Sequence, residues 1–135
     1  MEDRNYRIAL VDDEPKITKL LKLVVEDNFT CIVEVFNDPT KALARLREVQ
    51  FDAISLDHRM PKLSGMDLVK LLRTSLGPNQ KTRILLLTGY REEAECANLD
   101  LLDEVIFLEK PIDETHYLRW MKFVLLQKEA SQSAL

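Results

Sequence analysis

The stretch IALVDDEP, at residues 8–15, is the most informative part of this sequence. Its apolar half predicts a buried β-strand, and two carboxylates, Asp12 and Asp13, follow that strand directly. A second apolar run, at residues 53–56, ends in the same way with Asp57. If these two strands are parallel neighbours, the three carboxylates meet at one edge of a sheet.

Short apolar runs alternate with amphipathic stretches along the rest of the chain. Helix starts are marked by Pro15, Pro39 and a Ser64–Asp67 capping box. The expected strands span residues 6–11, 31–36, 52–56, 83–88 and 105–108, and the expected helices span residues 15–27, 39–49, 64–76, 91–100 and 113–128. Nearly continuous apolar strands that alternate with helices are typical of a parallel sheet covered on both faces. The pattern therefore predicts an α/β fold with five parallel strands.

The composition limits the classes of protein to consider. The chain has 135 residues, of which 46% are apolar and 31% charged, as expected for one globular domain. We expect this domain to span residues 1–128, with residues 129–135 as a flexible tail or the beginning of a linker. The net charge of −4 lacks the basic character of a nucleic-acid-binding protein, and no run approaches the roughly 18 apolar residues of a membrane span. The N-terminus has no signal-peptide pattern, so the expected location is the cytoplasm.

Two further polar residues follow apolar runs at equivalent positions. Thr88 closes the run at 84–87, and Lys110 lies shortly after the run at 105–108. In open α/β sheets, ligands bind beyond the carboxyl ends of the strands, so one rim would combine carboxylates, a hydroxyl and an ammonium group. Clustered carboxylates repel one another unless a cation neutralises them, and hard oxygen ligands suit Mg²⁺. The residues therefore predict a magnesium-dependent pocket for a phosphoryl group.

Four motifs together resemble the receiver domain of two-component response regulators, including the chemotaxis regulators. They are VDDEP at 11–15, LDHRMP at 56–61 followed by Gly65, LTG at 87–89, and the pair Lys110-Pro111. The resemblance covers the chain from Tyr6 to about Gln127. It implies a doubly wound, flavodoxin-like (βα)5 sheet with strand order 2-1-3-4-5. It also implies a cis peptide bond before Pro111.

The resemblance assigns a role to each residue of the pocket. Asp57 would accept a phosphoryl group from a phosphohistidine on a sensor histidine kinase or a histidine phosphotransfer protein. Mg²⁺ would be held by a set of oxygen ligands from Asp12, Asp13, Asp57 and the backbone carbonyl of Arg59. Thr88 and Lys110 would stabilise charge on the transferred group. Such a domain is a signalling switch rather than an enzyme.

The same resemblance predicts how the switch is transmitted. Phe107 matches the aromatic switch position and would turn into space that opens when the Thr88 hydroxyl moves toward the phosphoryl group. The surface of the fourth helix, fifth strand and last helix would report this change. On the last helix, Trp120 lies at the rim of the apolar stripe, and Phe123 and Leu126 fall outside it. This patch is a candidate surface for a homodimer or an output domain.

Two other functions remain open. A receiver-like scaffold would bind partners without phosphotransfer, although the intact set of pocket residues argues against it. A Mg²⁺-dependent phosphatase with an aspartate nucleophile would need a second acid two residues after Asp57, where this chain has Arg59. His58 follows the nucleophile, but strand alternation points it away from the pocket, and we expect it on the surface. Direct contact of this chain with nucleic acid or membrane is not expected.

Overall fold

The computed structural model describes residues 5–89 and 103–133, and it has the expected α/β architecture. All strand pairs are parallel, and the order in the sheet is β2-β1-β3-β4-β5, as predicted. The strands are β1 (Tyr6–Val11), β2 (Cys31–Phe36), β3 (Ala53–Asp57), β4 (Ile84–Thr88) and β5 (Val105–Glu109). The helices are α1 (Pro15–Asn28), α2 (Pro39–Leu46), α3 (Gly65–Thr74) and α5 (Glu114–Ser133). The helix expected at residues 91–100 lies outside the described residues.

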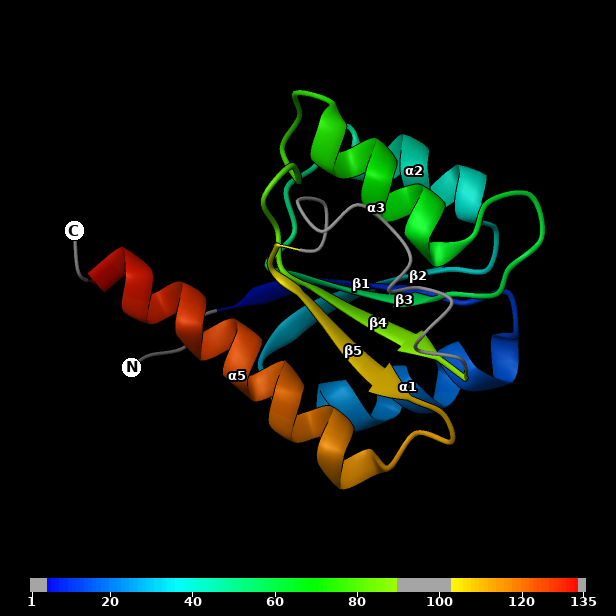
Figure 1. Ribbon diagram of the computed structural model, residues 1–135. Helices are drawn as coiled ribbons and strands as arrows, with labels where there is room; N and C mark the ends of the chain where they lie inside the picture. Colours follow the sequence, from blue (N-terminus) through cyan, green and yellow to red (C-terminus); the bar gives the residue numbers. More distant parts are fainter. Residues whose placement is uncertain (1–4, 90–102, 134–135) are drawn as a thin grey trace.

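Two apolar cores, one on each face of the sheet, hold the layers together. In Figure 1, α2 and α3 cover one face, and α1 and α5 cover the other. Every residue of β3 and β4 is buried, because these central strands are covered on both sides. Leu56 and Leu86 pack in the cluster on the α2 and α3 face, and Leu85 packs with Tyr117 in the cluster on the opposite face. The nearly continuous apolar sequence of these strands follows from this double coverage.

The helices begin where the sequence predicts. Pro15 and Pro39 are the first residues of α1 and α2. Asp38 caps α2, since its side chain accepts a hydrogen bond from the backbone N–H of Thr40 at 2.9 Å. At the start of α3, Ser64 accepts from the N–H of Asp67, and the Asp67 carboxylate accepts from the N–H of Ser64. This is the predicted capping box.

The end of α2 differs from the prediction because a distant residue takes over its hydrogen bonds. The helix ends at Leu46 instead of residue 49. Asn79 is a fully buried residue of the segment that joins α3 to β4. Its Nδ2 donates to the carbonyls of Leu46 (2.6 Å) and Val49 (2.7 Å). Its Oδ1 accepts from the N–H of Phe51 at 2.9 Å. One amide therefore pairs with three backbone groups at the end of α2 and in the α2–β3 connection.

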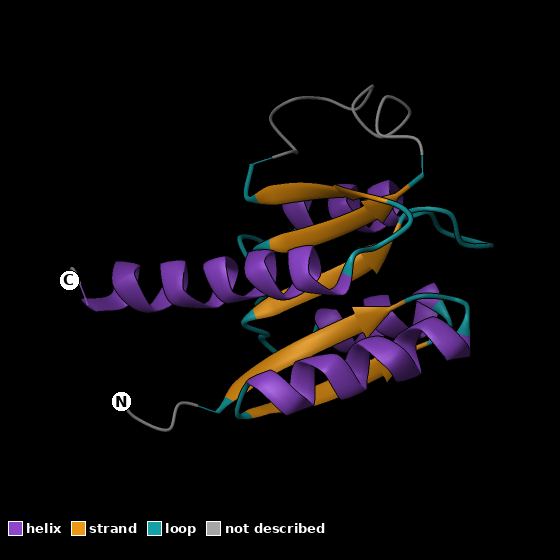
Figure 2. Cartoon of the chain, turned by 90° about the horizontal axis from the view of Figure 1, so that it is seen from below, coloured by secondary structure: helices purple, strands orange, loops and turns teal. Residues whose placement is uncertain are grey.

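The other helix ends also differ. α3 ends at Thr74 instead of residue 76, and α5 continues to Ser133 instead of ending near residue 128. The sequence at 127–130 consists of Gln, Lys, Glu and Ala, which are all strong helix formers, so continuation of the helix is favourable. Figure 2 shows α5 running past the edge of the sheet that lies opposite the carboxyl ends of the strands. Among the described residues, no helix combines the length and apolar character needed to span a membrane.

Candidate functional site

Three carboxylates converge at the carboxyl edge of the sheet. Asp12 follows β1 directly and Asp57 is the last residue of β3, and the two strands pair in register with Val11 opposite Leu56. One carboxylate oxygen from each of Asp12, Asp13 and Asp57 lies within 4.8 Å of the others. Asp12 and Asp57 are only 2% and 3% exposed. The adjacency of β1 and β3 thus produces the acidic cluster that strand-end chemistry predicts.

Burial disfavours the charged form of the carboxylates in this cluster. Burial raises the pKa of Asp12 to about 6, against the lowering effect of a 2.9 Å hydrogen bond from the Glu14 N–H to its Oδ1. The neighbouring Asp57 raises the pKa of Asp12 further. The other oxygen of Asp12, Oδ2, is buried and has no hydrogen-bond partner within the described part of the chain. A buried anionic oxygen of this kind needs a cation.

Lys110 supplies one positive charge to the cluster. Its Nζ forms an ion pair with Oδ1 of Asp57. Burial raises the pKa of Asp57, and the hydrogen bond from Lys110 opposes this rise. Although partial burial lowers the pKa of Lys110, its hydrogen bond to Asp57 raises that pKa overall, so the lysine stays charged. The peptide between Lys110 and Pro111 is cis, and the Lys110 N–H donates to the carbonyl of Thr88 at 2.9 Å.

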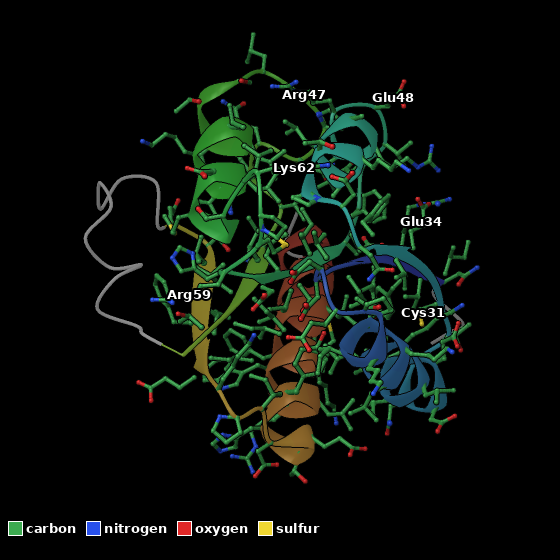
Figure 3. The ribbon with its side chains drawn as sticks, turned by 90° about the vertical axis from the view of Figure 1, so that its right-hand side faces the viewer. Cys31, Glu34, Arg47, Glu48, Arg59 and Lys62 are labelled. Carbon is green, nitrogen blue, oxygen red and sulfur yellow. The ribbon has the colours of Figure 1, made fainter. Side chains whose placement is uncertain are left out.

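Gly65 is required where the start of α3 crosses the end of β3. A Cβ at this position would lie 2.7 Å from the carbonyl oxygen of Asp57 and 2.9 Å from the Cα of His58. Real Cβ atoms do not approach backbone this closely, so only glycine fits. The Gly65 N–H also donates to the carbonyl of His58 at 2.8 Å. This close approach closes the β3–α3 loop, which carries Arg59 on its β5 side and Lys62 on its α2 side (Figure 3).

One expectation about a single residue needs correction. His58 is only 6% exposed, so its predicted surface position is wrong. His58 follows the last residue of β3, where the first turn of α3 covers it. The N–H of Met66 donates to Nδ1 of His58 at 3.4 Å. Phe107, the predicted switch residue, is half-buried, because β5 is the edge strand of the sheet. It packs against the core on the α2 and α3 face.

Asn37 joins the site although the sequence pattern did not single it out. It follows β2 directly, and its Nδ2 donates to the backbone carbonyl of Asp12 at 2.7 Å. The available signal was the one that identified the acids: a polar residue at the carboxyl end of a strand in the same sheet. Asn37 was missed because it carries no charge and falls within an ordinary helix-start sequence.

Comparison with known proteins places this geometry in a family. A family model described as the response regulator receiver domain matches residues 8–121. The chain belongs to this family. The receiver domain is 30% identical over 115 residues to the DNA-binding response regulator MtrA of Mycolicibacterium smegmatis. The match covers 84% of this chain but only 44% of MtrA, so the chain spans less than half of that relative.

Solved structures agree with this assignment. A CheY-like response regulator receiver domain from Methanospirillum hungatei superimposes with a TM-score of 0.80 at 21% identity, over 95% of this chain and 99% of that one. The chemotaxis response regulator CheY4 of Vibrio cholerae gives a TM-score of 0.79 at 27% identity, over 90% of this chain and all of that one. The receiver domain therefore has the flavodoxin-like fold of these regulators, and it belongs to two-component signal transduction.

Proposed function

We propose that this receiver domain is a phosphorylation-controlled switch. Asp57 accepts a phosphoryl group from a phosphohistidine on a sensor histidine kinase or a histidine phosphotransfer protein. The observation that carries the proposal is the cluster of three carboxylates, of which Asp12 and Asp57 are buried, beside the ammonium group of Lys110. Within it, Asp12 Oδ2 is buried without a hydrogen-bond partner among the described residues. A cluster with this excess of negative charge is suited to a bound divalent cation and a phosphoryl group, not to a structural core.

The donor set fits Mg²⁺. Carboxylate oxygens are the hard ligands that Mg²⁺ prefers, and Asp12, Asp13 and Asp57 offer three within reach of one ion. The backbone carbonyl of Arg59, two residues after Asp57, is the fourth proposed ligand, as membership of the receiver family implies. When bound, the ion would neutralise negative charge on the transferring phosphoryl group.

The residues of the chain then act in defined ways. A carboxylate oxygen of Asp57 forms a bond to phosphorus while the P–N bond of the donor breaks, and the leaving imidazole keeps the electron pair and takes up a proton. Lys110 already contacts the Asp57 carboxylate and places its charge on a phosphoryl oxygen. Thr88, which is 2% exposed at the end of β4, donates its hydroxyl to another. The chain accepts a group and holds it, so it acts as a switch rather than as a turnover enzyme.

Strand register supports the proposed transmission to the surface. Phe107 pairs with Leu86 across β4 and β5, and both contact the core on the α2 and α3 face. Thr88 lies two residues beyond Leu86, so it faces the same side as Phe107. Movement of the Thr88 hydroxyl toward a phosphoryl group would therefore free space next to the Phe107 ring.

A partner surface lies on α5. Phe123 and Leu126 are 45% and 48% exposed, and the half-buried Trp120 packs edge-on against Phe123 with ring centroids 5.5 Å apart. This patch is the proposed docking surface for a second copy or an output domain. Phe123→Ser should reduce self-association or output-domain binding in the activated form, which sizing with and without beryllofluoride measures. Unchanged assembly in both states would remove this role.

Phosphorylation is tested by incubation with Mg²⁺ and acetyl phosphate, followed by intact-mass measurement and mapping of the modified residue. We expect one phosphoryl group on Asp57, none in the presence of EDTA, and none on Asp57→Asn. Asp27→Asn, on the exposed side of α1, is the matched control and should be modified like the wild type. An unmodified wild-type chain, or modification at another residue, would contradict the proposal and favour a scaffold that works without phosphotransfer.

A further inference from the structure

We propose that Asn37 is a positioning residue for the metal site: its side-chain amide holds the backbone between Asp12 and Asp13 so that both carboxylates face Asp57. This inference rests on the proposed function, since it concerns the same site. The side-chain amide of Asn37 donates to the backbone carbonyl of Asp12 and to the hydroxyl of Thr18, neither of which is a proposed ligand atom, so it acts through the peptide that carries the ligands.

The end of β2 holds Asp12 from both sides. The N–H of Asp12 donates to the carbonyl of Phe36 at 3.1 Å, which continues the β1–β2 ladder by one residue. The carbonyl of Asp12 accepts from Nδ2 of Asn37 at 2.7 Å. The backbone pairing of the two strands thus stops at Phe36, and a side chain provides the next bond.

Thr18 orients this amide. Asn37 Nδ2 also donates to Oγ1 of Thr18 at 3.0 Å, and that hydroxyl donates to the carbonyl of Pro15 at 3.1 Å. Because the Thr18 hydrogen is committed to Pro15, its lone pairs face Asn37. The carbonyl of Asp12 can only accept, so both neighbours require the nitrogen of the amide at this position. Thr18 is 2% exposed and lies in the first turn of α1, so it fixes the orientation of the Asn37 amide. We call the hydrogen bond from this amide to the Asp12 carbonyl the clamp.

The clamped carbonyl belongs to the peptide that joins Asp12 to Asp13. Rotation of this peptide would move both side chains, and like-charge repulsion within the cluster favours any rotation that separates them. The Asn37 amide opposes that relaxation, so the carboxylates stay converged without a cation. Substituting a residue that orients metal ligands from outside the ligand shell commonly lowers metal affinity about tenfold or more, and we expect about tenfold for loss of this clamp.

The test measures Mg²⁺ affinity by isothermal titration calorimetry on the wild type, Asn37→Ala and Asn28→Ala. Asn28 is the matched control: it is also exposed, and its Nδ2 donates to a backbone carbonyl, that of Val24, at 2.8 Å. It ends α1, about 20 Å along the helix axis from Pro15. We expect Asn37→Ala to weaken Mg²⁺ binding about tenfold and Asn28→Ala to leave it unchanged. Equal affinity of Asn37→Ala and wild type, or equal weakening in both variants, would overturn the inference.

Thr18→Val provides a second, nearly isosteric variant. Since Thr18 acts through Asn37, Thr18→Val should weaken Mg²⁺ binding less than Asn37→Ala, and the double variant should bind no more weakly than Asn37→Ala alone. Additive losses would overturn the arrangement in which Thr18 aims the amide.

A kinetic measurement separates positioning from general damage. Phosphorylation of Asn37→Ala by acetyl phosphate should reach the wild-type rate at saturating Mg²⁺ but need about ten times more Mg²⁺ for half of that rate. A lower rate at saturation would contradict a purely positioning role. Failure of the wild type to bind Mg²⁺ would instead refute the metal site. Equally tight binding by the wild type and by Asn37→Ala would refute only the role of Asn37.

Discussion

Substitution of Asp12 by Asn should stabilise the metal-free protein at neutral pH. The Asp12 carboxyl is 2% exposed, and burial raises its pKa from 3.8 to about 6. The variant removes the buried charge, and an Asn oxygen at the same place can still accept the hydrogen bond from the Glu14 N–H. The wild type retains the charge for the benefit of the proposed metal site, at the expense of stability.

The size and sign of the effect follow from proton linkage. The folded state binds the Asp12 proton more tightly than the unfolded state, so wild-type stability falls as the pH rises from about 4 to about 6 and levels off above about 7. A difference of roughly 2 pH units corresponds to about 3 kcal/mol. Asp12→Asn should therefore match the wild type near pH 4 and exceed it by as much as about 3 kcal/mol at pH 7.5. Asp57, whose pKa burial also raises, leaves some pH dependence in both proteins.

Urea unfolding in EDTA between pH 4 and 8 measures this difference directly, with Asp27→Asn as an exposed control. Addition of Mg²⁺ at pH 7.5 should then raise the stability of the wild type, because the ion binds the folded state, and should affect the variant much less. A stability difference between Asp12→Asn and wild type that does not change with pH would refute the reasoning.

Gly65→Ala should lose about 3 kcal/mol of folding free energy in urea unfolding, because its Cβ would lie under 3.0 Å from backbone. Gly77→Ala is the control: no atom lies within 4 Å of its Cβ position, so a change above about 0.5 kcal/mol there would undermine the comparison. Asn79→Ala should also cost about 3 kcal/mol, since it leaves buried backbone groups of the α2–β3 connection unpaired. The exposed Asn28→Ala should cost under about 1 kcal/mol, and equal losses would show that the buried network is not the cause.

Much of the architecture is predictable because strand and helix signals are local. The strands at 6–11 and 31–36 have the predicted bounds, since each is a mostly apolar run between polar residues. The helix starts at Pro15 and Pro39 are likewise encoded by neighbouring residues. The end of α2 was not predictable, because the residue that replaces its last hydrogen bonds, Asn79, lies 33 positions away from Leu46.

The candidate site likewise has features that the local sequence predicts and features that depend on distant residues. Residue types at strand ends were enough to bring Asp12, Asp13 and Asp57 together, since parallel strands present their carboxyl ends at one edge. The raised pKa of Asp12, the burial of His58 and the clamp from Asn37 depend on what covers each group in the folded chain. The sequence of residue types around each strand end therefore establishes which chemical groups can meet. The protonation and precise aim of those groups depend on contacts between distant segments, which exist only after the layers have packed.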